Sequence, residues 1–136
     1  MPHSSSPIGV FDSGIGGGTV LRQLRALLPA ERLVYLADQA YCPYGPRPVA
    51  EIRERSRAIT RWLLAHNAKA IVVACNSASA AALHALREEF PATAFIGMVP
   101  AVKPAALHTR SGVIGVLATT ATAGGTMLRD VIAQWA

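Results

Sequence analysis

The stretch Ile71-Val72-Val73-Ala74-Cys75-Asn76-Ser77-Ala78 joins an apolar, β-rich run to an alanine-rich helical run, with a thiol at the junction. Open α/β sheets bind ligands outside the carboxyl ends of their strands, and a helix N-terminus there offers free N–H groups that stabilise a thiolate. Cys75 is therefore the first candidate for a nucleophile or a base. The alternative is a structural cysteine, because free cysteine is among the most buried residue types.

Short β-rich runs alternate with helical patterns on both sides of this stretch. Apolar runs predict strands at residues 8–11, 33–37, 69–74, 94–98 and 112–118. Apolar residues three and four positions apart predict helices at residues 18–28, 49–67, 79–90 and 126–135, with a helical turn between Pro100 and Pro104. Residues 38–48 contain three prolines and one glycine, which predicts a long loop. The alternation predicts an α/β fold with a doubly wound parallel sheet.

The chain is expected to divide near residue 98. Glycine, proline and threonine are concentrated around residues 97–112, which is typical of a domain boundary. We expect residues 1–98 to form a first α/β lobe, and residues 99–136 to form a linker and the first strand and helix of an incomplete second lobe. A strand at residues 112–118 needs parallel neighbours, and only one helix follows it in this sequence.

The composition excludes several classes of protein. A chain of 136 residues with 51% hydrophobic residues can bury a core, which excludes a disordered protein. Two cysteines at unrelated spacing suggest free thiols in a reducing compartment. Residues 1–7 lack the basic and apolar regions of a secretory signal, and no apolar run is long enough to span a membrane. We therefore expect a cytoplasmic protein without a membrane partner.

The net charge of +5 does not by itself indicate nucleic-acid binding. Arg53, Arg57 and Arg61 share one helix face, but Glu51 and Glu54 are interleaved with them and no aromatic residue lies on that face. This pattern favours a solvated helix surface over a nucleic-acid surface. A mild positive charge also suits a small anionic substrate.

Three predicted loops should meet at the carboxyl edge of the sheet. They are Asp12-Ser13-Gly14, Pro43-Tyr44-Gly45 and Cys75-Asn76-Ser77, and they follow the first three predicted strands. Together they offer an acid, hydroxyl groups, a phenol, a thiol and an amide, which is the inventory of a catalytic or binding site. Each residue also has a structural interpretation, since Asp12 and Ser77 can cap helices and Tyr44 can pack its ring on the loop.

A nucleotide-binding module is the alternative function. Gly14-Ile15-Gly16-Gly17-Gly18 follows the first strand, and Asp38 lies about twenty residues further on, as in a dinucleotide fingerprint. However, Thr19 stands where that fingerprint has glycine or alanine, and Asp12 places an anion where pyrophosphate would approach. No Walker A lysine follows the glycines.

No metal site is expected. His3, His66, His84 and His108 are dispersed, and none has ligand spacing with a cysteine or a carboxylate. Cys42 is a second thiol, which we expect to pack within its loop.

Four segments, in this order, resemble the glutamate racemases of the aspartate/glutamate racemase superfamily. They are Gly9-Val10-Phe11-Asp12-Ser13-Gly14-Ile15-Gly16-Gly17, Ala37-Asp38 followed by Pro43-Tyr44-Gly45, Cys75-Asn76-Ser77-Ala78, and Val99-Pro100-Ala101-Val102-Lys103-Pro104-Ala105. Aspartate and hydantoin racemases share the general plan, but the Asp-Ser-Gly turn and the Pro-Tyr-Gly loop look like the glutamate enzymes.

The resemblance implies a function and roles for the residues of the three loops. It implies interconversion of L- and D-glutamate for peptidoglycan synthesis, by two cysteines and without a cofactor, pyridoxal phosphate or a metal. Cys75 would deprotonate the D-isomer, and Asp12 would assist its proton transfer. The implied substrate contacts are Asp12, Ser13, Pro43, Tyr44, Gly45, Asn76, Ser77, Thr119 and Thr120. The resemblance also allows a homodimer of the full-length enzyme.

The chain departs from the family pattern in two respects. Ser77 and Gly18 stand where threonine and leucine are more common, and these changes are tolerable. Family members are longer, with a second lobe in which a Gly-Cys-Thr-His segment supplies the other cysteine. We therefore expect residues 1–136 to be the amino-terminal portion of such an enzyme and to have negligible racemase activity alone, because Cys42 should approach the substrate from the same side as Cys75.

Overall fold

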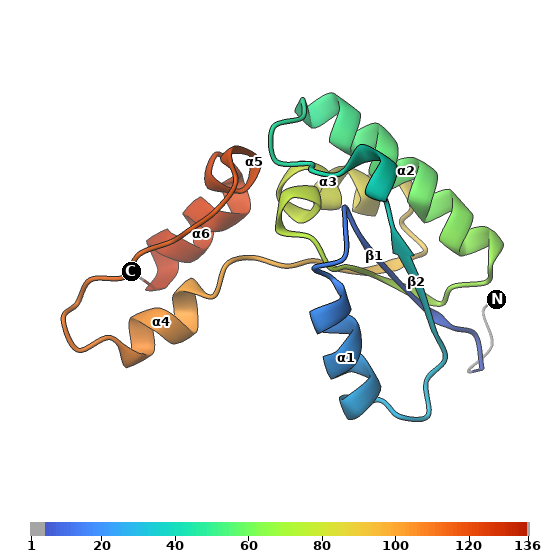
Figure 1. The fold of residues 1–136 in the computed structure, drawn as a ribbon, viewed down its shortest axis with the longest axis horizontal. Coiled ribbons are helices and arrows are strands. Elements are labelled where there is room, and N and C mark those ends of the chain that lie inside the picture. Colours follow the sequence, from blue (N-terminus) through green and yellow to red (C-terminus); the bar gives the residue numbers. More distant parts are fainter. Residues whose placement is uncertain (1–4, 136) are drawn as a thin grey trace.

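Four parallel strands form one sheet in the order β2-β1-β3-β4 (Figure 1). The computed structural model describes residues 5–135. Its strands are β1 (Ile8–Asp12), β2 (Leu33–Ala37), β3 (Ala70–Val73) and β4 (Ala94–Ile96). The central strand, β1, pairs with β2 on one side and with β3 on the other. The predicted parallel sheet is confirmed.

Helices cover both faces of this sheet. α1 (Gly18–Leu27) lies on one face, and α2 (Val49–Ala65) and α3 (Asn76–Glu89) lie on the other (Figure 1). A parallel sheet requires such cover, because both of its faces are apolar. The doubly wound arrangement predicted from the sequence is therefore confirmed.

Alternate side chains of β1 supply two apolar layers. Val10 packs with Val72 on the α1 face, whereas Phe11 packs with Val73 on the face covered by α2 and α3. Successive side chains of a strand point to opposite faces, and the register pairs Val10 with Val72 and Phe11 with Val73. One central strand thus organises both layers of the core.

α2 and α3 pack closely because α3 presents small side chains. Ala78, Ala81 and Ala82 of α3 are buried in the same cluster as Ile52 and Leu63 of α2. Leu63 also fills the space over Gly9, where a built Cβ would lie 3.0 Å from its Cδ1.

The arginine face of α2 serves the contact with α3. Arg57 and Arg61 both form ion pairs with Glu89, and Arg57 also reaches Glu54. Arg53 donates a hydrogen bond from Nε to the carbonyl of Ala81 at 2.7 Å. These three arginines are therefore ion-paired or hydrogen-bonded within the protein.

Three further helices follow the sheet and lie to one side of it (Figure 1). They are α4 (Val102–His108), α5 (Thr120–Ala123) and α6 (Thr126–Trp135). Lys103 places its Nζ 4.1 Å from the centroid of the Trp135 ring, which ties α4 to α6. None of the helices within residues 5–135 combines the length and apolar character needed to cross a membrane.

The predicted strand at residues 112–118 is wrong. This segment has no regular secondary structure and pairs with none of the described strands, and Val113 and Leu117 are 76% and 102% exposed. A strand is stabilised by its ladder, and the segment has no neighbour to supply one. The division near residue 98 stays a prediction, and the ends of its two expected parts (residues 1–4, with His3, and Ala136) lie outside the described residues.

Other differences are local. α3 begins at Asn76 rather than at Ser79, because the side chain of Cys75 caps it. A short 3-10 helix, Gln39–Tyr41, lies in the predicted loop. α5 has no counterpart among the helices predicted from the sequence.

We predict that Leu63→Ala lowers the free energy of unfolding by about 3 kcal/mol, because it empties a fully buried position. Leu27→Ala is the matched control, since Leu27 is 76% exposed, and it should change the stability by less than about 0.5 kcal/mol. Urea denaturation of the two variants measures both effects. Equal losses would contradict the assignment of Leu63 to the core.

Candidate active site

The predicted site residues lie at the carboxyl edge of the sheet. Asp12 is the last residue of β1, and Cys75 lies two residues beyond β3. The N–H of Asp38, just after β2, donates to the carbonyl of Asp12 at 2.9 Å. A cleft of about 380 Å³ opens at this edge. Among the predicted residues, those lining it are Asp12, Cys75, Asn76, Ser77 and Thr119.

The glycine turn after β1 is shaped around the carboxylate of Asp12. The N–H of Gly17 donates to Asp12 Oδ2 at 2.8 Å. A Cβ at Gly17 would lie 2.7 Å from the Cβ of Asp12 and 3.2 Å from that of Ala74, so only glycine fits. The turn thus presents its N–H to a carboxylate of the protein, in the region where a nucleotide-binding turn would hold phosphate.

Cys75 lies at the N-terminus of α3 and is connected to Asp12 through Ser13. Cys75 Sγ donates to Ser13 Oγ at 3.6 Å, and Ser13 Oγ donates to Asp12 Oδ1 at 3.4 Å. Cys75 Sγ in turn accepts from the N–H of Ala78 at 3.4 Å. The hydrogen bonds from Cys75 to Asp12 therefore run in one direction, from a thiol to a carboxylate.

The pKa of the Cys75 thiol is raised above its ordinary value. Burial is the main cause, since it disfavours the charged form. The N–H of Ala78 and the hydroxyl of Ser13 oppose the shift, and the negative charge of Asp12 adds to it. Burial therefore outweighs the stabilisation of a thiolate that the helix N-terminus offers.

A second group of residues connects α5 to the site. Ser77 Oγ and Thr119 Oγ1 are 2.8 Å apart and share a hydrogen bond. Thr119 also accepts from the N–H of Thr122, which caps α5. Gly45 lies against Thr119, since a Cβ built on Gly45 would be 2.8 Å from Thr119 Cγ2. The Pro43–Gly45 loop and Ser77 thus meet at one threonine.

Tyr44 lies in the core instead of lining the cleft. It is 1% exposed, and its hydroxyl donates to Asp38 Oδ2 at 2.6 Å. Burial and this hydrogen bond to Asp38 raise its pKa. Pro43 is exposed, and Thr120 and Gly45 line a neighbouring cleft. The hydroxyl of Tyr44 therefore cannot contact a substrate in this arrangement.

Cys42 is exposed, so the expectation that it packs within its loop is wrong. Its sulfur lies over Gly14, where a built Cβ would be 3.1 Å from Sγ. A side chain at residue 14 would therefore crowd the Cys42 thiol.

Tyr35 and Thr122 also belong to the site, although neither was predicted from the sequence. The hydroxyl of Tyr35 donates to the carbonyl of Gly14 at 2.8 Å and so holds the glycine turn. Thr122 lines the cleft and is 2% exposed. Its position three residues after Thr119 is a helix-capping spacing that could have indicated it. Tyr35 carries no comparable local signal.

Comparison with known proteins identifies the family. The sequence profile of the Asp/Glu/Hydantoin racemase family matches residues 18–135. The chain belongs to this family. Its racemase relatives include the glutamate racemase of Roseiflexus sp. (strain RS-1), which is 64% identical over 98% of the chain, and that of Deinococcus radiodurans, which is 54% identical over 99%. The resemblance inferred from the four segments is confirmed.

Solved racemase structures share the fold. The chain superposes on the glutamate racemase of Bacillus anthracis with a TM-score of 0.86, at 39% identity and over 97% of its length. For the Escherichia coli glutamate racemase, in complex with L-glutamate and the activator UDP-MurNAc-Ala, the TM-score is 0.85 at 40% identity over 95% of the chain. The chain covers 50% and 49% of these two structures, and 49% and 46% of the Roseiflexus and Deinococcus relatives. It thus spans about half the length of the racemases it matches.

We predict that alkylation of Cys75, measured in a Cys42→Ser background, has a midpoint above that of a free thiol, about 8.5, because burial disfavours the thiolate. Asp12→Asn should lower the midpoint by removing a negative charge. Ser13→Ala should raise it, because the Ser13 hydroxyl can donate to Cys75 once Cys75 is a thiolate. Iodoacetamide rates as a function of pH measure all three. A midpoint below that of free cysteine, or an upward shift in Asp12→Asn, would contradict the electrostatic account.

Proposed function

We propose that this chain supplies one half of the active site of a glutamate racemase that needs no cofactor. The supporting observation is the hydrogen-bonded sequence from Cys75 through Ser13 to Asp12 at the edge of the cleft. A buried neutral thiol becomes a base only after it loses its proton, and these contacts provide an acceptor for that proton.

In the proposed reaction, Cys75 transfers its proton through Ser13 to Asp12 and becomes a thiolate. The thiolate then removes the α-proton of D-glutamate, and the electrons of the broken C–H bond remain on the α-carbon. A second acid on the opposite face returns a proton and completes the inversion. That acid would come from a second lobe, because Cys42 follows β2 in the same lobe as Cys75.

The cleft offers uncharged groups for the two carboxylates of glutamate. The residues that line it include the amide of Asn76 and the hydroxyls of Ser77 and Thr119, and the N-terminus of α3 adds backbone N–H groups. Asp12 is the one carboxylate among the lining residues within the described part of the chain, and until it accepts the proton of Cys75 its charge suits the substrate ammonium group. Pro43, Tyr44 and Gly45 would act through the position of their loop.

The proposed biological setting follows from the family and the thiols. Both cysteines are free, which suits a reducing compartment such as the cytoplasm. Production of D-glutamate there would serve peptidoglycan synthesis. We propose the homodimer only for a full-length enzyme.

We predict that D-glutamate and L-glutamate raise the melting temperature of the chain, whereas NAD and ATP do not. The carboxylate of Asp12 holds the glycine turn that a nucleotide would need, which disfavours the alternative of a nucleotide-binding module. Thermal-shift measurements with the four compounds distinguish the two functions. Stabilisation by NAD or ATP alone would favour the nucleotide-binding module.

We predict that Asp12→Asn lowers kcat more than it raises KM. The test protein joins residues 1–136 to the carboxyl-terminal half of the Roseiflexus relative. Loss of the proton acceptor should lower kcat by about a hundredfold, and Asp130→Asn, an exposed position on α6, is the matched control. Circular dichroism follows the inversion of D-glutamate, the direction in which Cys75 must first lose its proton.

Residues 1–136 alone should give negligible inversion in the same assay. Inversion by this half that Cys75→Ser abolishes would contradict the requirement for a second acid. A higher KM with unchanged kcat in Asp12→Asn would make Asp12 a binding residue instead.

A further inference from the structure

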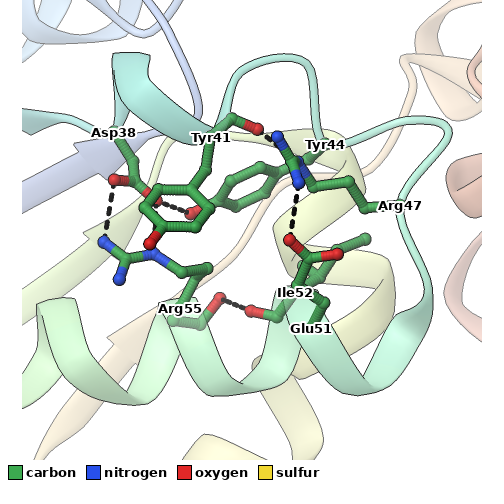
Figure 2. Close-up of polar contacts among 8 residues, drawn as sticks. Asp38, Tyr41, Tyr44, Arg47, Glu51, Ile52 and Arg55 are labelled. Atoms are coloured by element: carbon green, nitrogen blue, oxygen red, sulfur yellow. Dashed lines mark hydrogen bonds and ion pairs between the residues drawn. The ribbon is translucent and has the colours of Figure 1, made fainter.

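A buried carboxylate, Asp38, contacts Tyr44 of the Pro43–Gly45 loop (Figure 2). Arg55 of α2 donates to it twice, from Nε to Oδ2 at 3.0 Å and from Nη2 to Oδ1 at 2.9 Å. The hydroxyl of Tyr44 donates to Oδ2 at 2.6 Å. A bidentate arginine pair fixes both the distance and the plane of a carboxylate. The side chain of Asp38 therefore has one orientation, and Tyr44 is bound to it.

Neighbouring side chains enclose this group. The guanidinium carbon of Arg55 lies 3.8 Å from the centroid of the Tyr41 ring, and that of Arg47 lies 5.4 Å from it. Arg47 also donates to the carbonyl of Tyr41 and forms an ion pair with Glu51 (Figure 2). Arginine stacks on an aromatic face while keeping its hydrogen bonds. The segment on both sides of Tyr44 is thus held to the start of α2.

The Pro43–Gly45 loop contacts the candidate active site through Gly45. Gly45, next to Tyr44, lies against Thr119, and Thr119 shares a hydrogen bond with Ser77 at the N-terminus of α3. A shift of the loop would therefore move Thr119 relative to Ser77. Arg55 itself is absent from the residues that line the cleft.

We infer that Arg55 is a positioning residue of the proposed racemase site: through Asp38 and Tyr44 it holds the Pro43–Gly45 loop at the place where Gly45 supports Thr119 beside Ser77. The inference rests on the proposed function. Burial on its own would raise the pKa of Asp38, but the hydrogen bonds from Arg55 and Tyr44 outweigh it and lower the pKa, which keeps the carboxylate charged.

Loss of Arg55 should leave the fold intact. α2 remains attached to α3 by the ion pairs of Arg57 and Arg61 with Glu89 and by the buried side chains of Ile52 and Leu63. The effect of the loss should therefore be confined to the loop and to the threonine it supports.

The experiment compares amide hydrogen exchange in Arg55→Gln with that of the unchanged chain. The amides of Arg47, which donates to the carbonyl of Tyr44, and of Thr122 and Ala123, which donate to Thr119, report on the loop and on α5. They should exchange at least about tenfold faster, while the amides of β1 and β3 keep their rates. Arg61→Gln, on the same helix, is the matched control and should change none of these reporters. Arg55→Lys should recover part of the protection.

Glutamate affinity, measured on the same samples by nuclear magnetic resonance titration, should fall by about tenfold in Arg55→Gln and remain unchanged in Arg61→Gln. Unchanged affinity in Arg55→Gln, unchanged exchange at the reporter amides, or faster exchange throughout the sheet would each overturn the inference. If Arg55→Gln does not fold, Tyr44→Phe must give the same local pattern, and failure to do so also overturns it. If the unchanged chain binds no glutamate, the proposed function fails, and the exchange pattern still decides whether Arg55 positions the loop.

Discussion

The parallel register of β1 between β2 and β3 is the constraint on which the candidate site depends. It sets Asp12 opposite Ala37 and Phe11 opposite Val73, so the three strands end at nearly the same level. Three loops that are far apart in the sequence are therefore brought to one edge. A slip of one residue in β1 would exchange its two core faces and also remove Asp12 from the neighbourhood of Cys75.

Two opposing electrostatic effects shape that edge. Backbone N–H groups of the glycine turn and of α3 favour negative charge. The N–H of Gly17 in the turn donates to the carboxylate of Asp12, and the N–H of Ala78 in α3 donates to Cys75. Burial and the charge of Asp12 then keep Cys75 neutral. A thiol in this environment holds its proton until a neighbouring group accepts it, which suits the acid and base role proposed for Cys75.

The sequence was sufficient for the features that depend on local pattern. Apolar runs predicted β1 to β4, and the junction at Cys75 predicted the thiol at a helix N-terminus, because both signals lie within a few neighbouring residues. Asp38 and Arg55 are separated by 17 residues, and nothing local indicates that they pair. The direction of the Tyr44 hydroxyl depends on that pair, so it could not be predicted either. The segment 112–118 has the composition of a strand, but composition does not supply a partner strand.

The unpaired segment at residues 113–118 has a practical consequence. Val113-Ile114-Gly115-Val116-Leu117-Ala118 contains no charged residue and no proline, and Val113, Val116 and Leu117 are exposed. Unpaired apolar segments of this kind act as templates for strand addition between molecules. Solutions of this polypeptide should therefore be prone to aggregation as the concentration rises. Leu117→Lys would place a charge in the segment, which should disfavour intermolecular β-sheet and leave the buried core unchanged.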